Sequence, residues 1–256
     1  MRVASFNVNS VRARLAVVVG WLLENRPDVL CLQETKAQDA DFPATEFEKI
    51  SYTCAFKGEK GYNGVAILST SPTGKVRFGF DEEPQDKPRL ITAEFGGIAI
   101  VNTYVPQGHL PDSEKFAYKL EWFARLLEYF DGNFKATEPL LWVGDLNIAP
   151  EAIDVYDPES LAGHVCFHPD VHKALKKVME WGFVDVFRKH CTDAGRYTFW
   201  DYRLRGAFKR NLGWRLDHIM ATRPLADRSI ACYIDKKPRT AERPSDHTPI
   251  VAEFDW

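Results

Sequence analysis

Long apolar runs are absent from this sequence of 256 residues. No stretch approaches the roughly 20 consecutive apolar residues that a membrane-spanning helix needs, so we expect no membrane partner. The N-terminus also lacks the apolar core and cleavage site of a secretory leader, because Met1 and Arg2 lead directly into an alternating strand pattern. A cytoplasmic protein is the simplest expectation.

Cysteine is scarce and scattered. The five cysteines are Cys31, Cys54, Cys166, Cys191 and Cys232. Their number is odd and their spacing matches neither a disulfide framework nor a zinc site. The sequence therefore indicates that the fold depends on its hydrophobic core and not on covalent crosslinks.

An excess of positive charge is missing as well. Lys and Arg number 33 against 36 Asp and Glu, for a formal net charge of −3. This balance argues mildly against a protein that coats DNA. It is compatible with an enzyme whose own carboxylates hold a metal ion.

Internal repeats and low-complexity linkers are also absent, and 45% of the residues are hydrophobic. A chain of this length can bury one large core, so we expect a single domain over residues 1–256. No long apolar surface pattern stands out, and a monomer is the default expectation.

Hydrophobic periodicity predicts many short strands and a few helices. Strands are predicted at residues 2–8, 29–32, 52–56, 65–69, 75–80, 89–95, 98–105, 140–143, 196–202, 219–221, 230–234 and 250–254. Helices are predicted at residues 11–25, 42–50, 114–130 and 168–181, with Ser113 as the N-cap of the third. This pattern favours an α/β sandwich, in which packed sheets carry helices on the outside.

The segment 140–150 contains the most informative strand. Four apolar residues are followed by Gly144, which we expect to end the strand, and then by Asp145 and Asn147. Residues at i and i+2 of an extended chain point to the same side. Two interpretations remain open for this segment alone: an ordinary Asx-turn, or a site at the end of a strand.

Similar polar residues occur at the ends or starts of other predicted strands. The set comprises Asn7, Glu34, Tyr104, Asp145, Asn147, Asp217, Asp246 and His247. Half-buried carboxylates need partners or a cation, and oxygen ligands without cysteine favour magnesium or manganese over zinc. A single histidine in such a set suggests acid–base or electrostatic work, with an Asp fixing its tautomer.

Two loops are candidates for contact with nucleic acid. Residues 203–210 carry most of the local positive charge, beside the aromatic residues of 197–202. Residues of these types can bind backbone phosphates and stack on bases. A loop whose charges only aid solubility would have the same composition. Residues 57–64 are rich in glycine and lysine, but their spacing is not that of a P-loop. They predict either a phosphate contact or a plain hairpin loop.

Two further groups of residues have ordinary interpretations. Lys115 and Lys119 lie one helical turn apart, which is typical of a solvated helix face. His164, His168 and His172 straddle a predicted helix start without a recognised zinc spacing, so we do not expect them to bind a metal.

Taken in order, several short segments resemble one family. They are residues 6–9 (FNVN), 32–36 (LQETK), 61–66 (GYNGVA), 104–108 (YVPQG), 144–147 (GDLN), 215–217 (RLD) and 245–247 (SDH). The ordered set resembles the exonuclease III family of apurinic/apyrimidinic endonucleases, over almost the whole chain. The resemblance implies a DNase I-like four-layer α/β sandwich, with two packed mixed sheets flanked by helices.

The resemblance also implies roles for the polar residues. It makes Glu34 the principal ligand of Mg²⁺, for which Mn²⁺ is a plausible substitute. Further metal contacts are implied for Asn7, Asp145, Asn147, Asp246 and His247. Asp145 would orient or deprotonate the attacking water, and Asn147 would hold that water or a phosphate oxygen. Tyr104 would donate to a phosphate oxygen or help the leaving group. His247, oriented by Asp217, would contact the scissile phosphate, and either Asp145 or this pair could be the general base.

The substrate implied is double-stranded DNA with abasic sites or blocked 3′ ends. Residues implied to contact it are Asn9, Gln107, Phe199, Arg203, Trp214 and Leu216. Three of them, Phe199, Trp214 and Leu216, would form an apolar pocket for a flipped-out sugar. Cys166 beside that pocket is small, as in relatives that cut abasic DNA, whereas the nearby His168 is bulkier.

The implied activity is cleavage on the 5′ side of abasic sites, with 3′-phosphodiesterase, 3′-phosphatase and 3′→5′ exonuclease activities. The alternative within the family is a 3′-end-processing enzyme with little abasic-site activity. Two other classes are a phosphatase of lipid or inositol phosphates and a non-catalytic module on the same fold. The ordered segments and the filled chemical positions argue against both.

Overall fold

Twelve strands form two six-stranded sheets in the computed structural model, which describes residues 1–256. The strands are β1 (Arg2–Asn7), β2 (Val29–Gln33), β3 (Thr53–Lys57), β4 (Val65–Ser69), β5 (Gly74–Phe78), β6 (Leu90–Phe95), β7 (Ile98–Tyr104), β8 (Leu140–Asp145), β9 (Phe183–Asp185), β10 (Asp217–Thr222), β11 (Ser229–Ile234) and β12 (Ile250–Phe254). The first sheet has the order β11-β12-β1-β2-β4-β3 and the second β5-β6-β7-β8-β10-β9.

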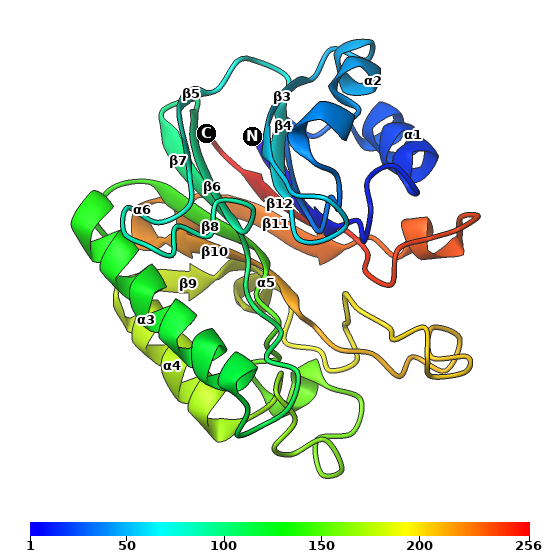
Figure 1. Cartoon of the computed structure of the whole chain (residues 1–256), viewed down its shortest axis with the longest axis vertical. Coiled ribbons are helices and arrows are strands. Elements are labelled where there is room, and N and C mark those ends of the chain that lie inside the picture. The colour runs from blue at the N-terminus through cyan, green and yellow to red at the C-terminus, as the bar shows by residue number, and fades with distance from the viewer.

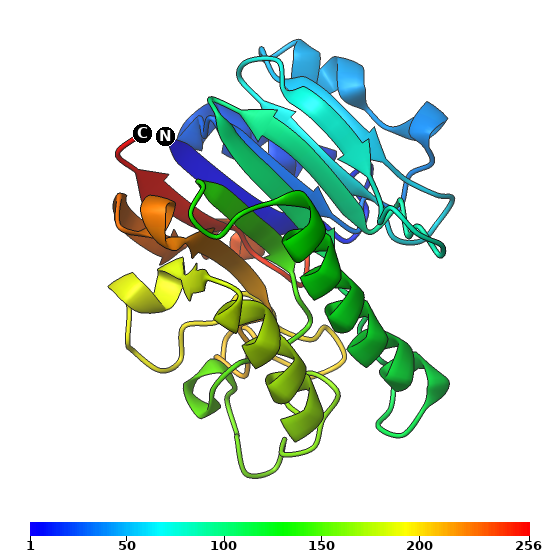
Figure 2. The same cartoon turned by 90° about the vertical axis from the view of Figure 1, so that its left-hand side faces the viewer.

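Helices cover the outer faces of the two sheets. They are α1 (Leu15–Asn25), α2 (Ala44–Glu48), α3 (Glu114–Asn133), α4 (Pro169–Glu180), α5 (Val186–His190) and α6 (Arg223–Ala226), with short 3-10 helices η1 (Asp39–Asp41), η2 (Ala152–Asp154) and η3 (Lys237–Thr240). Figures 1 and 2 show α1 and α2 outside the first sheet and α3 and α4 outside the second. None of these helices is long and apolar enough to cross a membrane. The four-layer sandwich predicted from the sequence is confirmed.

Three apolar clusters fill the spaces between these layers. In β8, Leu141 and Val143 face the cluster of 21 buried residues between the sheets. Their neighbours Leu140 and Trp142 face the cluster of 25 beneath α3 and α4. A strand covered on both faces needs apolar residues at every position, which explains the unbroken run at residues 140–143. Each such side chain contributes about 1.5–3 kcal/mol when fully buried.

The strand directions bring several chain segments to one edge of the sandwich. β1 and β2 run parallel in the first sheet, and β7 and β8 run parallel in the second. β12 and β10 run antiparallel to them, so their first residues lie beside the last residues of β1 and β8. The polar residues at these ends and starts therefore share one edge.

The expectation that Gly144 ends the eighth strand is wrong. β8 continues through Gly144 to Asp145, which pairs with Tyr104 of β7. Gly144 has φ +138°, and a Cβ built on it would lie 1.9 Å from the carbonyl oxygen of Thr103. Glycine is therefore present here because a neighbouring strand approaches closely, and not because the strand stops.

Several boundaries also differ from the prediction. Residues 196–202 form no strand and contribute only isolated bridges, in which Phe199 pairs with Trp214 and with His247. The first helix begins at Leu15 because Asn9 and Ser10 adopt positive φ, and the backbone of Val11 is held by Thr35. The short elements β9, α5 and α6 were missed, since their apolar patterns span too few residues. The N-cap Ser113 is confirmed and accepts a hydrogen bond from Phe116 N.

The interpretation of Lys115 and Lys119 as one solvated face is half wrong. Lys115 is exposed, but the Lys119 side chain is fully buried. Its ammonium group donates to backbone carbonyls of three loops instead of facing solvent. The helical spacing places the two lysines on one face of α3. At Lys115 this face is open to solvent, whereas one turn later, at Lys119, it packs against the loops.

Candidate active site

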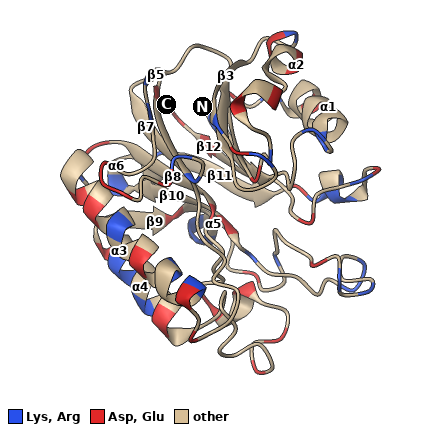
Figure 3. Ribbon diagram, viewed as in Figure 1, with Lys and Arg blue, Asp and Glu red and all other residues tan.

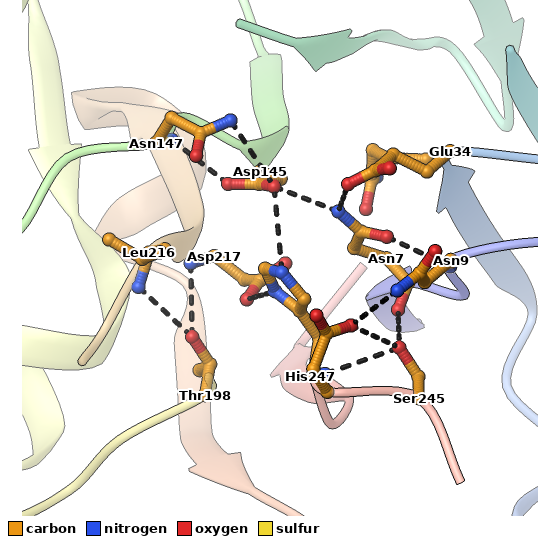
Figure 4. Close-up of polar contacts among 12 residues, drawn as sticks. Asn7, Asn9, Glu34, Asp145, Asn147, Thr198, Leu216, Asp217, Ser245 and His247 are labelled. Atoms are coloured by element: carbon orange, nitrogen blue, oxygen red, sulfur yellow. Dashed lines mark hydrogen bonds and ion pairs between the residues drawn. The ribbon is translucent and has the colours of Figure 1, made fainter. Parts of the chain in front are cut away.

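The polar residues of the strand ends converge at one edge of the sandwich (Figure 4). Asn7 ends β1, and Glu34 follows β2 directly in the first sheet. Tyr104 ends β7 and Asp145 ends β8 in the second, while Asp217 starts β10. Asp246 and His247 lie in the loop before β12. The site therefore joins the two sheets at the edge where their parallel strands end.

Asn7 connects the carboxylates of the two sheets. Its Nδ2 donates to Glu34 Oε1 and to Asp145 Oδ2, each at 2.8 Å. Its Oδ1 accepts from the backbone N–H of Asn9 at 3.0 Å. The carboxamide is buried and satisfied at both ends, so it holds the two acids at a fixed separation.

Three side chains form a group with the spacing of metal ligands. One ligand atom from each of Glu34, Asp145 and His247 lies within 4.8 Å of the other two. Two anionic oxygens close together in a buried place suit a hard divalent cation, which would relieve their mutual repulsion. Asp246 lies nearby, half-buried, and its Oδ1 accepts from Asn9 Nδ2 at 3.0 Å. The residues present thus fit a divalent metal site.

The two acids differ in their electrostatic surroundings. Burial raises the pKa of Asp145, and the charges of Asp217 and Glu34 raise it further against the opposing effect of His247. Burial also raises the pKa of Glu34, but Lys36 and the hydrogen bond from Asn7 outweigh this and hold it below its ordinary value. Glu34 therefore remains ionised, whereas Asp145 can exchange a proton closer to neutral pH.

His247 is paired with Asp217. Its Nδ1 lies 2.7 Å from Asp217 Oδ2, and its Nε2 lies 3.8 Å from Asp145 Oδ2. Burial lowers the pKa of His247, but the carboxylates of Asp217 and Asp145 outweigh burial and raise it well above its ordinary value. Thr198 Oγ1 accepts from the backbone N–H groups of Leu216 and Asp217, which fixes the start of β10. The imidazole is therefore held as a cation that points toward Asp145 (Figure 4). In this form it has no lone pair for a metal ion, so Glu34 and Asp145 are the members of the group that would hold one.

Asn147 and Tyr104 complete the wall formed by the second sheet. Asn147 has φ +50°, and its Nδ2 donates to Val105 O at 2.9 Å. Its backbone N–H donates to Asp145 Oδ1 at 2.9 Å, which orients that carboxylate. Burial and the charges of Glu34 and Asp145 raise the pKa of Tyr104 well above its ordinary value. Tyr104 therefore keeps its proton and can donate it in a hydrogen bond.

The segment that carries Glu34 is anchored by the glycine-rich loop 57–64. The backbone N–H groups of Thr35 and Lys36 donate to the carbonyls of Gly64 and Asn63. Lys36 Nζ reaches Glu34 Oε2 at 2.8 Å and Asn9 Oδ1 at 2.6 Å. This loop therefore supports the site from behind, whereas Tyr62 at its tip is 73% exposed. Asn9 links Lys36 to Asp246 in this structure.

A cavity of about 750 Å³ opens beside these residues. Phe199, Trp214 and Leu216 line it, as predicted from the sequence, together with Gln107, Arg203 and Cys166. The Phe199 ring packs against the His247 ring with centroids 4.8 Å apart. Apolar walls thus continue directly from the polar edge into the cavity.

Sequence patterns missed part of the cavity wall. The segment 163–168, which the resemblance placed beside the pocket, contributes His164 as well as Cys166. The lining residues that were not expected are His109, Leu110, Tyr156, Leu161, Asp201, Leu204 and Leu212. They come from irregular segments, where no periodicity signals burial. The rings of His164 and Trp214 pack in a tilted arrangement with centroids 4.8 Å apart, and His164 Nδ1 accepts from Cys166 N. His168 and His172 have separate partners, Asp170 N and Ala149 O, so the three histidines do not form a metal group.

Basic residues project beyond the cavity. Arg203 is held by Asp201 and exposes 90% of its side chain. The loops 203–210 and 236–243 extend to the right in Figure 3, and both contain several Lys and Arg residues, which are drawn in blue. The guanidinium of Arg239 lies 5.9 Å from the ring centroid of Trp200 and 5.2 Å from that of Phe208, which joins these two loops. Positive charge is therefore concentrated in these two loops, although the net charge of the whole chain is −3.

The chain is similar to known proteins over almost its whole length. Residues 4–247 match the family described as Endonuclease/Exonuclease/phosphatase family. Exodeoxyribonuclease III of Haemophilus influenzae is 34% identical, over 99% of this chain and all of the relative. An AP endonuclease structure from Archaeoglobus fulgidus is 53% identical, with a TM-score of 0.98 and full coverage of both chains. A 3′ phosphatase, NExo, from Neisseria, bound to a product DNA hairpin, is 37% identical with a TM-score of 0.95 over both full chains.

The chain belongs to the exonuclease III family. It is therefore a nuclease, a hydrolase of the DNA-repair type that this family comprises. The identity to named nucleases over the whole chain, rather than the fold that phosphatases of the same superfamily share, carries this assignment. The relatives named above include an exodeoxyribonuclease, an AP endonuclease and a 3′ phosphatase. The preferred DNA substrate of this chain therefore depends on its own cavity.

Proposed function

We propose that the protein cleaves duplex DNA on the 5′ side of abasic sites in a magnesium-dependent reaction of base excision repair. The observation that carries this proposal is the apolar cavity adjoining Asp145 and His247. Phe199, Trp214 and Leu216 give this cavity an apolar wall against which a sugar without a base can pack. The same polar edge would remove 3′ phosphates and other 3′ blocks. It would also catalyse the 3′→5′ exonuclease reaction.

The chemical requirement is to attack a phosphodiester that is already anionic. A magnesium ion held by Glu34 and its neighbours would neutralise charge on the phosphoryl oxygens and the leaving oxygen. His247, kept as a cation by Asp217, donates a hydrogen bond to a phosphoryl oxygen. Tyr104 and the Asn147 carboxamide supply further donors on the wall formed by the second sheet.

The electrostatics favour Asp145 as the general base. Burial raises the pKa of Asp145, so its carboxylate accepts a proton more readily at neutral pH than an ordinary Asp does. Burial lowers the pKa of His247, but the carboxylates of Asp217 and Asp145 together outweigh burial and keep the imidazole protonated, which leaves no free nitrogen to accept a proton. Asn147 N–H fixes one Asp145 oxygen at 2.9 Å and thereby directs the carboxylate. Asp145 takes the proton of the attacking water in this scheme.

Recognition of the lesion depends on the cavity and on the basic loops around it. Arg203 and its neighbours in 203–210 grip the phosphate backbone, and Gln107 contacts the strand beside the extruded sugar. Asn9 contributes through Lys36 and Asp246, which it links. Cys166 is small and buried at the cavity wall, which leaves room for the sugar.

The alternative function is 3′-end processing with little cleavage at abasic sites. The presence of His164 in the cavity wall favours it, since an imidazole there narrows the space. The likeness to the NExo 3′ phosphatase points in the same direction. A panel of duplexes carrying a tetrahydrofuran site, a 3′ phosphate or no lesion, with and without magnesium, separates the two functions. Nicking of the tetrahydrofuran duplex supports abasic cleavage, and cleaning of 3′ ends without that nick overturns it.

A monomer in the cytoplasm is the form we propose for this activity. Duplex DNA has to reach the edge formed by β1, β2, β7 and β8 without obstruction by a second copy. Light scattering of the purified protein and cell fractionation test these two expectations.

A further inference from the structure

One lysine of α3 lies buried behind the active-site loops. Lys119 has no exposed surface, and its Nζ donates to three backbone carbonyls. The acceptors are Gln107 O at 3.2 Å, Asn147 O at 2.7 Å and Val165 O at 2.7 Å. An ammonium group has three N–H donors, so all of them are used. No carboxylate forms a salt bridge with this ammonium group, so the three carbonyls are its only hydrogen-bond partners. Burial lowers the pKa of Lys119, and the charge of the nearby Asp145 opposes this effect.

The three carbonyls belong to three separate loops of one cavity. Gln107 and Asn147 line the cavity themselves, and Val165 lies between the lining residues His164 and Cys166. The stem of Lys119 is enclosed as well, because a Cβ built on Gly108 would lie 3.2 Å from its Cδ. One side chain thus holds three walls of the cavity together.

Removal of these hydrogen bonds would be costly. Hydrogen bonds from a charged donor are stronger than those between neutral groups. Without Lys119 Nζ, each of the three carbonyls would lack a hydrogen-bond partner until it shifted or bound a water molecule. The carbonyl of Asn147 is one of the three, while the Asn147 side chain contacts Asp145 and Val105 O. Movement of this loop therefore changes the width of the cavity mouth.

We propose that Lys119 is a positioning residue that sets the cavity for the extruded abasic sugar. It does not touch the phosphate, and it acts through the loops of Gln107, Asn147 and Val165. This inference rests on the proposed abasic-site activity. It adds that the preference for an abasic site over a 3′ phosphate depends on a buried ammonium group in α3.

The two substrates differ in their need for the cavity. In abasic cleavage the sugar beyond the scissile phosphate enters the cavity. A terminal 3′ phosphate places its phosphorus at the same edge but carries no sugar beyond it. The ratio of the two rates therefore reports on the cavity, whereas a lower amount of folded protein reduces both rates by the same factor.

The experiment compares Lys119→Met with the wild-type protein under single-turnover conditions with magnesium. Methionine keeps the length and the apolar stem of the side chain but has no N–H donors. We expect the rate on a tetrahydrofuran duplex to fall by about tenfold or more relative to the rate on a 3′-phosphate duplex. Lys176→Met, which removes an exposed lysine of α4, is the matched control and should leave the ratio unchanged.

Equal falls on both substrates, or no fall on either, would overturn the inference. If Lys119→Met does not fold, Lys119→Gln keeps two N–H donors and is measured in the same way, with a smaller but still selective loss expected. A wild-type protein that does not cut the tetrahydrofuran duplex at all overturns the proposed function, and this inference with it. A wild-type protein that cuts it while the variants keep the wild-type ratio overturns only the inference.

Discussion

Carboxylates outnumber cations at the centre of the site. Glu34, Asp145, Asp217 and Asp246 face only two cationic side chains, His247 and Lys36. Crowded acids repel one another, and the raised pKa of Asp145, caused by burial and by its acidic neighbours, is the result. A divalent cation would relieve this repulsion, which gives the proposed metal requirement a cause in this chain's own residues.

The pair of Asp217 and His247 leads to a pH prediction. Burial lowers the pKa of His247, and Asp217 is the first of the carboxylates that raise it, so removing that charge lowers the pKa of the imidazole. If protonated His247 is needed, activity is lost as the pH rises through its pKa. Asp217→Asn should therefore move the alkaline limb of the pH–rate profile to lower pH by about one unit or more.

The test is a single-turnover profile with the exposed variant Asp131→Asn as control. That change removes an exposed acid of α3 that is not among the charges acting on the imidazole, and it should leave the profile in place. An alkaline limb that stays fixed in Asp217→Asn would show that His247 does not act as a cation.

At the scale of elements, the ends of strands carry the residues of the site. The close approach of β7 and β8 fixes the position of Asp145. β7 and β8 come so near at Gly144 that a Cβ would lie 1.9 Å from Thr103 O. Gly144→Ala should lower the free energy of unfolding by about 2–4 kcal/mol, since the clash is with backbone and φ is +138°. Urea unfolding measures this change.

The matched control for that prediction is Gly132→Ala in α3. Nothing lies within 4 Å of a Cβ at Gly132, and alanine is the better helix former. We expect a gain of about 0.5–1 kcal/mol there. Similar stabilities for the two variants would contradict the account of β8.

The strand ends explain how far the sequence alone could predict the site. Asp145 follows an unbroken apolar run, and Glu34 and Tyr104 follow similar runs, so pattern and polarity placed them at an edge. Lys119 and His164 could not be assigned in this way, because their surroundings come from loops distant in the chain. Gly144 was misjudged because a strand glycine and a strand-ending glycine are identical in sequence.

The two interpretations of Asp145 are compatible in the structure. Its Oδ1 accepts from the backbone N–H of Asn147, as the carboxylate of an Asx-turn does. Its Oδ2 accepts from Asn7 Nδ2 and faces the other polar residues of the site. The turn therefore orients the carboxylate that the end of β8 delivers.

For the molecule as a whole, charge is distributed unevenly. The net charge is −3, yet exposed cations gather in the loops 203–210 and 236–243 beyond the cavity (Figure 3). Changing Arg205, Lys209 and Arg210 to alanine should raise KM on duplex DNA. It should also make the log–log dependence of affinity on salt shallower, by about 0.9 for each phosphate that is no longer neutralised. The rate at saturation should be unchanged, because none of the three residues lines the cavity.

The control for this prediction is the alanine variant of Lys173, Lys176 and Lys177. These lysines are exposed on α4, away from the polar edge. They carry the same total charge as the loop residues. If both variants weaken DNA binding alike, general charge and not the loop determines affinity.

The central claim is that the edge joining the two sheets hydrolyses a phosphodiester beside the cavity, with Asp145 as the base. The most direct test is single-turnover nicking of a duplex with one tetrahydrofuran site by wild type, Asp145→Asn and His247→Ala, in magnesium and in EDTA. We expect nicking by the wild type only with magnesium, and a fall of about 10²–10⁴-fold in each variant. Unaltered nicking by both variants would contradict the account.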